Sequence, residues 1–183
     1  MVVKLTELRS SDCERVYSWR SSREVAQWMV NDGPIPWEVH RTWFARALVD
    51  GDAKVRIVSY GNVGCGVLTW TREPASVFSF GIYVVPILAP VKKIGSAALA
   101  LLLRDLFDDE AAVVVRADVL IENERAIRAY SALGFSKVEG SRRLVERSNG
   151  STELQEMALS KEDWAVRRLS IWLELSELGL LSD

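Results

Sequence analysis

The sequence predicts a single α/β domain, and three observations support this fold class. Hydrophobic residues make up 49% of the 183 residues and charged residues 26%, which is the balance of an ordinary globular protein. Short strand-like segments alternate with longer segments that space their apolar residues as helices do. Their order is strand, helices, three strands, helix, strand, helix and hairpin, which is typical of a mixed sheet covered by helices. Because no repeat or linker interrupts this order, residues 1–183 are expected to form one domain.

Composition and charge exclude several partners and sites. The chain has 23 basic and 25 acidic side chains, a formal net charge of −2, so nucleic acid is not an expected partner. Cys13 and Cys65 lie far apart without a metal-ligand spacing, so two free thiols and no metal site are expected. The start has no apolar signal-peptide core, and no apolar run is long enough to span a membrane. A cytoplasmic protein is therefore expected, and the sequence is compatible with a homodimer.

The first quarter is expected to form three helices after an opening strand. Ser11 and Glu14 have the spacing of a capping box, which predicts a helix over residues 12–20. Ser22 is expected to cap a second, short helix, and Pro36 suits the first turn of a third. Four of the seven tryptophans lie in this quarter, so aromatic side chains concentrate there.

The remaining elements follow from periodicity and turn residues. Strands are expected at residues 2–8, 55–58, 64–70, 77–85 and 113–120, with a closing hairpin at 144–147 and 154–159. Helices are expected at residues 94–107 and 123–133, and residues 161–183 are expected to form an amphipathic C-terminal helical extension. Gly81 lies inside a strand segment, where glycine often marks a bulge or a close backbone approach.

Residues 92–97 form the first segment with the chemistry of a binding site. They are Lys92, Lys93, Ile94, Gly95, Ser96 and Ala97. The first amides of a helix have no intrahelical partners and lie at the positive end of its dipole, and small residues let a phosphate approach them. Two neighbouring lysines favour the same ligand. The alternative is that the small residues serve packing and the lysines only solvate a loop.

The second segment follows the strand at 113–120. Asn123 is a good N-cap, Ala126 and Tyr130 share a helical face, and Gly134-Phe135 turns the chain back into a strand. On its own, this pattern is equally compatible with a tyrosine that only packs in the core.

Together the two segments resemble the cofactor-binding stretches of the GNAT acetyltransferases. That family carries R/Q-x-x-G-x-G/A at the start of one helix and, after a later strand, N-x-x-A-x-x-x-Y-x-x-x-G-F. The second pattern is met in full by Asn123, Ala126, Tyr130, Gly134 and Phe135. The resemblance extends over nearly the whole chain, because the order and spacing of the elements also fit.

The first pattern is met in part, in either of two registers. One register places Lys92 where arginine or glutamine is usual, and the other places Lys93 where a glycine is usual. Both leave Gly95 in the turn that would hold a pyrophosphate.

The resemblance implies a fold, a reaction and a set of roles. The fold is a mixed, mostly antiparallel sheet of about seven strands, splayed between the fourth and fifth and flanked by helices. Acetyl-CoA lies in that gap as the acetyl donor, and its acetyl group passes directly to a primary amine. Tyr130 is then the general acid that protonates the departing thiolate. The cofactor contacts come from the backbone of Ile82, Tyr83 and Val84, from residues 92–97, and from Asn123 and Ala126.

A catalytic base is missing from the place where many GNAT enzymes carry one. The family often uses a glutamate on the fourth strand, whereas residues 77–81 here hold no carboxylate. Ser79 is suited to position a water molecule but is not itself a base.

The N-terminal third resembles the acetyltransferases that act on nucleotide-linked amino sugars in the pseudaminic acid pathway. Those enzymes carry a similar W-R, V-x-x-W-M and I-x-x-x-x-H-x-x-F pattern, and aromatic faces with an arginine suit a base and a diphosphate. The expected acceptor-binding residues are Trp19, Arg20, Trp28, Met29 and His40, within a pattern that also includes Val25, Ile35 and either Trp43 or Phe44. The alternative is that these aromatics belong to the core and that His40 is a buried structural histidine.

Three functions are compatible with these features. The first is acetylation of a nucleotide-linked amino sugar, and the second is acetylation of protein N-termini or antibiotic amines. The third is a GNAT module that binds acyl-CoA without catalysis. A strongly acidic acceptor cleft would favour a cationic antibiotic, whereas arginine and tryptophan favour the sugar nucleotide.

Overall fold

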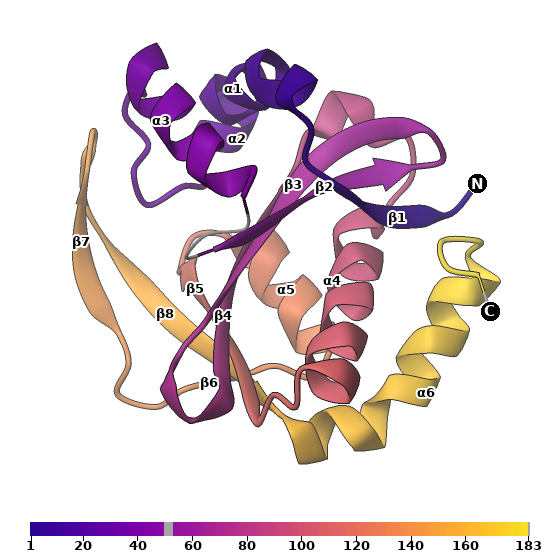
Figure 1. Cartoon of the computed structure of the whole chain (residues 1–183). Helices are drawn as coiled ribbons and strands as arrows, with labels where there is room; N and C mark the ends of the chain where they lie inside the picture. Colours follow the sequence, from indigo (N-terminus) through magenta and orange to yellow (C-terminus); the bar gives the residue numbers. More distant parts are fainter. Residues whose placement is uncertain (50–52, 183) are drawn as a thin grey trace.

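A computed structural model describes residues 1–49 and 53–182 of the chain. These residues form one mixed sheet of eight strands in the order β1-β2-β3-β4-β5-β8-β6, with β7 paired to β8. The strands are β1 (Val3–Glu7), β2 (Lys54–Tyr60), β3 (Val63–Arg72), β4 (Val77–Val84), β5 (Val114–Leu120), β6 (Ser136–Lys137), β7 (Arg143–Arg147) and β8 (Gly150–Ser160). The predicted mixed, mostly antiparallel sheet is confirmed, and the short β6 brings the expected seven strands to eight (Figure 1).

The sheet opens between its fourth and fifth strands. β4 and β5 run parallel and pair only from Val77 with Val114 to Ser79 with Arg116. Beyond that pair β4 stays with β3 as far as Val84, while β5 stays with β8 as far as Leu120. The gap-side edge of β4 therefore has no strand partner from Phe80 onward, which confirms the expected splay.

Six helices are present in the described part of the chain. They are α1 (Cys13–Ser21), α2 (Arg23–Ala26), α3 (Trp37–Ala47), α4 (Ile94–Arg104), α5 (Glu124–Ala132) and α6 (Lys161–Glu177). The predicted helix over 94–107 ends as α4 at Arg104 and continues as a π-helical turn, Asp105–Asp109. No helix among residues 1–49 and 53–182 is long and apolar enough to cross a lipid bilayer.

The helices cover the two faces of the sheet with separate cores. On one face α4 and α5 pack on apolar residues such as Leu68 and Phe78. On the other face Val16 of α1 and Phe44 of α3 pack on strand residues such as Val67. α4 is rich in alanine and leucine and buries seven of its eleven residues, as expected for a helix that is apolar all round.

The C-terminal helix α6 belongs to the main core. Its Trp164 stacks on Phe107 with ring centroids 6.1 Å apart, and Ile171 and Leu175 are buried in the cluster that includes α4. Arg104 lies over the Trp172 ring at 5.2 Å. The segment predicted as an extension is thus one layer of the domain.

The predicted capping residue near α1 was wrong. The capping hydrogen bond is made by Asp12, which accepts from the Arg9 amide at 2.8 Å, whereas Ser11 makes none. The capping residue was misassigned because the spacing of residues predicts a helix but does not decide which neighbouring polar side chain turns inward. Gly81 marks a close approach rather than a bulge, because a Cβ there would lie 3.2 Å from the Thr69 hydroxyl, and the bulge lies in β2 between Val58 and Ser59.

The second helix is shorter than its spacing suggested. α2 ends at Ala26, so Trp28 and Met29 lie in the irregular segment that follows it. The Ser22 hydroxyl donates to the Trp19 carbonyl at 2.8 Å instead of accepting from the helix.

The contrast between Asp12 and Ser11 can be tested by stability measurements. Asp12 is buried, holds the Arg9 amide and pairs with Arg15 at 2.7 Å. We expect Asp12→Ala to lower the free energy of unfolding by about 1–2 kcal/mol, because an N-terminal cap and its partners are lost. Ser11→Ala should change it by less than about 0.5 kcal/mol. Urea denaturation measures the free energy of unfolding of both variants. Equal losses of this free energy would contradict the assignment of the cap to Asp12.

Candidate active site

Helix α5 carries Tyr130 to the place where the sheet opens. Asn123 caps this helix as predicted, its side-chain oxygen accepting from the Ala126 amide at 3.1 Å. Seven residues after the cap, the Tyr130 ring meets Phe80 edge-on with centroids 5.3 Å apart. Phe80 is the first β4 residue beyond the last β4–β5 pair. Tyr130 therefore lies at the point where the two strands separate.

The environment of Tyr130 keeps its hydroxyl protonated. The side chain is only 6% exposed and also contacts the Phe135 ring, 5.8 Å away between centroids. Burial raises the pKa of Tyr130 above its ordinary value. A phenol in this state acts as a hydrogen-bond and proton donor rather than as a base.

The turn before α4 offers backbone amides to an anion. Lys93 precedes the helix with φ +66°, a left-handed conformation that glycine adopts more readily than lysine. This favours the register in which Lys93 occupies the glycine position of the family pattern. A Cβ built on Gly95 would come no nearer than 3.6 Å to Val84, an ordinary contact. Packing alone therefore does not require glycine at position 95.

The two lysines beside this turn differ in their surroundings. Lys93 forms an ion pair with Glu174 of α6, so its ammonium group is already engaged. Lys92 is exposed. Ile94 and Ala97 are buried and anchor the first turn of α4, while Gly95 and Ser96 are partly accessible.

The backbone of β4 alternates between its two neighbours. The Val85 amide donates to the Cys65 carbonyl at 2.8 Å, and a Cβ on Gly66 would lie 2.3 Å from the Tyr83 carbonyl oxygen. Val85 and Tyr83 thus direct backbone groups toward β3. By the alternation of a strand, Ile82 and Val84 direct theirs toward the gap. Of the three residues predicted to pair with the pantetheine arm, Ile82 and Val84 direct backbone groups toward the gap, whereas Tyr83 directs its backbone toward β3.

On the opposite face, a pocket of about 420 Å³ lies between the N-terminal helices and strands β3 and β4. Of the predicted acceptor residues, Arg20, Met29 and His40 meet in its wall. The other lining residues are Val16, Asn31, Ile35, Val39, Trp43, Val67, Thr69, Gly81, Ile82 and Tyr83. Sequence reasoning missed Asn31, Val67 and Thr69, which carry no motif, whereas Trp43 rather than Phe44 takes the aromatic position.

Two predicted acceptor residues do not line this pocket. Trp19 packs in the core of the α1–α3 face, with the Arg15 guanidinium 5.2 Å from its ring. Trp28 is 41% exposed and lies outside the pocket wall. Aromatic spacing in the sequence did not separate residues on the core side from residues on the pocket side.

Arg20 supplies the charge of the pocket. It is the one charged side chain among the described residues that line it, and none of them is an aspartate or glutamate. The guanidinium donates to the Asn31 carbonyl at 2.6 Å, which uses one of its five N–H groups. Burial lowers the pKa of Arg20, and the neighbouring Tyr83 and Asp32 oppose this effect.

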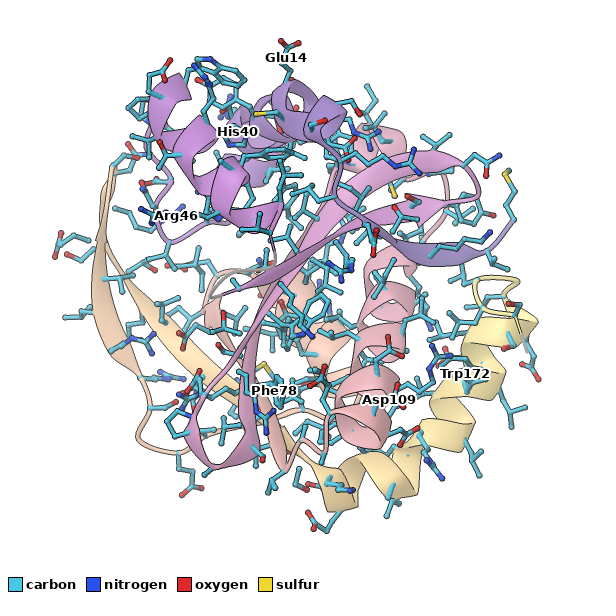
Figure 2. All side chains as sticks on the ribbon, viewed as in Figure 1. Glu14, His40, Arg46, Phe78, Asp109 and Trp172 are labelled. Atoms are coloured by element: carbon cyan, nitrogen blue, oxygen red, sulfur yellow. The ribbon has the colours of Figure 1, made fainter. Side chains whose placement is uncertain are left out.

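His40 is held by contacts within the helical layer. Its Nε2 lies 3.0 Å from the Cys13 carbonyl, so this nitrogen donates the hydrogen bond. Burial lowers the pKa of His40, which keeps it uncharged near pH 7. The ring stacks on Trp37 with centroids 5.7 Å apart and contacts the Trp43 ring at 5.5 Å. Figure 2 shows His40 among the N-terminal helices.

The β7–β8 hairpin closes against the segment after α2. Ser148 donates to Asp32 from its amide at 3.0 Å and from its hydroxyl at 2.6 Å. Arg147 donates to the Gln27 carbonyl at 2.7 Å and pairs with Asp32. These bonds lower the pKa of Asp32 and fix the loop that carries Asn31 in the pocket wall.

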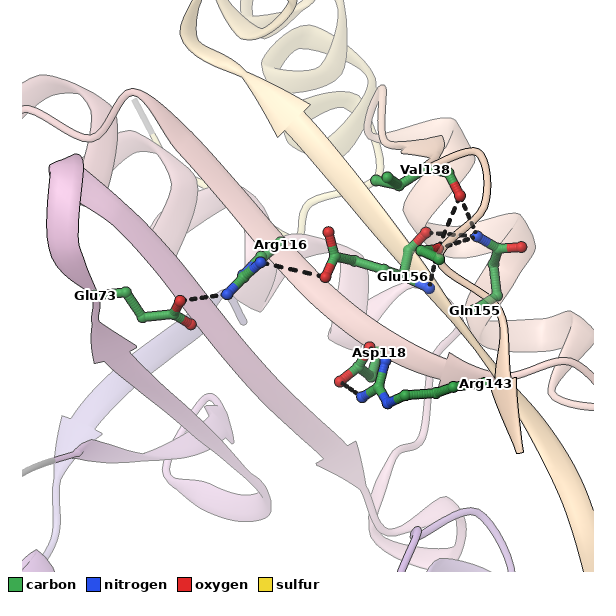
Figure 3. A network of polar contacts seen from close by, with 8 residues as sticks. Glu73, Arg116, Asp118, Val138, Arg143, Gln155 and Glu156 are labelled. Carbon is green, nitrogen blue, oxygen red and sulfur yellow. Dashed lines mark hydrogen bonds and ion pairs between the residues drawn. The ribbon is translucent and has the colours of Figure 1, made fainter. Parts of the chain in front are cut away.

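Carboxylates beside the gap are engaged in ion pairs. Arg116, at the last β4–β5 pair, binds Glu73 and Glu156, while Arg143 binds Asp118 (Figure 3). The face of β4 that borders the pocket carries Ser79, Gly81 and Tyr83, none of which is a carboxylate. No cluster of three or more histidine, cysteine, aspartate or glutamate side chains suited to a metal occurs in the described residues.

Three features together are typical of one class of acyl-transferring enzymes. They are the splayed sheet, the free backbone amides at the start of α4 and the buried tyrosine beside the gap. A family model described as the acetyltransferase (GNAT) domain matches residues 3–136, and the chain belongs to this family. It is an acetyl-CoA-dependent N-acetyltransferase. The residues present fit acetyl-CoA, since β4 has a free edge in the gap and the partly accessible Gly95 would leave only an ordinary contact to Val84 if it carried a Cβ.

Particular relatives share this fold. Acetyltransferase PseH of Campylobacter jejuni is 24% identical over 131 residues, covering 72% of this chain and 81% of PseH. Spermidine N-acetyltransferase from Vibrio cholerae, solved with CoA and spermine, has a TM-score of 0.78 at 13% identity, covering 89% of this chain and 98% of that one. Aminoglycoside acetyltransferase AAC(6')-Ib, solved with coenzyme A, has a TM-score of 0.72 at 17% identity, covering 91% and 99%.

Substitution of Gly95 tests the proposed pyrophosphate turn. We expect Gly95→Val to weaken acetyl-CoA binding about 10- to 100-fold, because its branched side chain fills space that the ligand needs. Gly95→Ala, whose Cβ makes an ordinary contact, should weaken it less. Calorimetry measures both affinities, and circular dichroism verifies that α4 is intact. Unchanged affinity in a folded Gly95→Val variant would remove this turn from the binding site.

Proposed function

We propose that this enzyme acetylates a primary amine on a nucleotide-linked amino sugar. The observation that carries the proposal is the charge of the pocket: its described lining holds one arginine and no carboxylate. An arginine matches a diphosphate through bidentate hydrogen bonds. A polyamine or aminoglycoside, by contrast, would bring positive charges to a wall that has no negative charge to receive them.

The rim of the pocket and one relative support the same acceptor. Trp43 and Val39 line the pocket and remain partly exposed, so they offer flat or apolar surface to a nucleobase. The similarity to PseH points in the same direction as the N-terminal pattern of Arg20, Met29, Ile35 and His40. The spermidine and aminoglycoside enzymes share the fold at 13% and 17% identity, which carries no acceptor preference to this chain.

The two faces of β4 suggest how the reaction is arranged. Acetyl-CoA supplies a thioester whose carbonyl carbon accepts the amine. Ile82 and Val84 lie next to the gap through their backbones, and the pocket opens beside Gly81. The amine attacks from the pocket side, a C–N bond forms and the C–S bond breaks. Tyr130 donates to the departing sulfur from the other side of the sheet.

The amine has to enter as the free base. The carboxylates Asp118 and Glu156 beside the gap are held by arginines, and the described pocket wall has no carboxylate to accept a proton. A guanidinium in the pocket also disfavours an ammonium ion nearby, which lowers the pKa of a bound amine. The proton released from nitrogen is then taken up by water.

Two experiments test the proposed substrate class: a comparison of acceptors and a substitution of Arg20. With acetyl-CoA as donor, we expect a higher kcat/KM for a nucleotide-linked amino sugar than for spermidine or kanamycin, followed by release of the CoA thiol. Arg20→Gln should raise the KM of the sugar nucleotide about 10- to 100-fold, because a charge-assisted hydrogen bond is lost. The affinity for acetyl-CoA should stay the same. Preference for a polycation by the unmodified enzyme would overturn the proposed acceptor.

Removal of the Tyr130 hydroxyl tests the general acid. Tyr130→Phe keeps the ring contacts with Phe80 and Phe135, so stability should change little. A thiol has a pKa of about 8.5, so the thiolate leaves fairly easily without help. We therefore expect kcat to fall by about 10²-fold, with acetyl-CoA affinity preserved. Steady-state kinetics with thiol detection measures the effect, and full activity would exclude Tyr130 from the mechanism.

A further inference from the structure

Tyr83 has a buried hydroxyl that no part of the described chain satisfies. Its side chain faces the pocket from β4, and the hydroxyl oxygen is buried without a hydrogen-bond partner. Other tyrosines of the same region are satisfied: the Tyr17 hydroxyl donates to the Ile35 carbonyl at 3.0 Å. Burial raises the pKa of Tyr83, so the hydroxyl is present as an O–H donor.

An unpaired buried hydroxyl reduces the stability of a fold. Leaving a polar group buried without a partner costs free energy, whereas an apolar group of the same shape avoids that cost. Phenylalanine at position 83 would fill the same space among Val67 and the apolar residues of the α1–α3 face. The hydroxyl therefore makes no hydrogen bond in the described part of the unliganded fold, and it belongs to a side chain that lines the pocket a ligand would occupy.

Arg20 lines the same pocket and, like the Tyr83 hydroxyl, can donate hydrogen bonds. Arg20 and Tyr83 both line the pocket, and the positive charge of Arg20 opposes the rise that burial causes in the pKa of Tyr83. Both are donors, and a guanidinium cannot accept a hydrogen bond from the phenol. A ligand that satisfies both must bring hydrogen-bond acceptors, and negatively charged oxygens match the guanidinium best.

We propose that Tyr83 and Arg20 form an oxyanion subsite in the acceptor pocket, which makes Tyr83 a specificity-determining residue. The subsite receives a phosphoryl or carboxylate oxygen of the acceptor, and this inference rests on the proposed function. Tyr83 is well placed for the task, because its neighbours Ile82 and Val84 border the acetyl-CoA gap through their backbones. The strand β4 thus sets the distance between the negatively charged group of the acceptor and the acetyl group of acetyl-CoA.

The matched pair Tyr83→Phe and Tyr17→Phe tests the subsite. Calorimetry is performed with saturating CoA, which occupies the cofactor gap, and with uridine diphosphate, inorganic pyrophosphate or malonate as the titrant. We expect a diphosphate to bind the unmodified enzyme and to bind Tyr83→Phe about 10- to 100-fold more weakly. Tyr17→Phe should keep the affinity. The melting temperature should rise or stay constant in Tyr83→Phe and fall in Tyr17→Phe, since only the latter loses an internal hydrogen bond.

The outcomes separate this inference from the proposed function. Equal diphosphate affinity in Tyr83→Phe and the unmodified enzyme would overturn the role of Tyr83 while leaving the sugar-nucleotide acceptor in place. Malonate binding that depends on Tyr83, without any diphosphate binding, would support the subsite and overturn the nucleotide-linked acceptor. Absence of binding by all three probes would overturn the subsite. A fall in melting temperature in Tyr83→Phe would also contradict it, because the hydroxyl would then have a structural partner.

Discussion

β4 and β5 pair over three residues and then part, and most of the functional architecture depends on this separation. If β4 and β5 stayed paired along their whole length, the sheet would be continuous. The backbone groups at the β4 edge would then be hydrogen-bonded to β5 and could not bind a ligand. Instead each strand keeps its antiparallel partner, β3 on one side and β8 on the other. The ion pairs of Arg116 with Glu73 and Glu156 tie the strands at the point of separation. The sheet thereby offers a free backbone edge without losing its stability.

The same geometry assigns different tasks to the two faces of β4. Phe80 points toward Tyr130 and the α4–α5 core, whereas Gly81 and Tyr83 point toward the pocket under the N-terminal helices. Donor and acceptor can therefore approach one gap from opposite sides of a single strand. Because the alternation of side chains is a property of every strand, this division needs no additional structural element.

Those parts of the site that lie within one continuous segment were predictable from the sequence. Asn123, Ala126 and Tyr130 follow the periodicity of one helix, and the structure brings them where that periodicity indicates. The splay and the strand order followed from the family resemblance rather than from propensity.

The acceptor side was less predictable, because its pocket forms between segments far apart in the chain. Asn31 comes from an irregular segment, and Thr69 faces the pocket from a strand whose other side is core. Trp19 packs against the core of the α1–α3 face and Trp28 is exposed outside the pocket wall, which their residue type alone did not indicate. The unsatisfied hydroxyl of Tyr83 has no sequence signal at all, since hydrogen-bond satisfaction is a property of the folded state.

The hydrogen bond between the Val3 amide and the Leu180 carbonyl, 2.7 Å long, has a consequence for synthesis on the ribosome. β1 is an edge strand, and its first residues emerge long before residue 180 has been made. Until then this edge presents unpaired backbone groups that other nascent chains can join. Leu180 and Leu181, together with α6, also complete the main core. Chain termination near residue 160 would therefore release a domain that has its catalytic elements but an uncovered core and an open edge, and such a product is prone to aggregate.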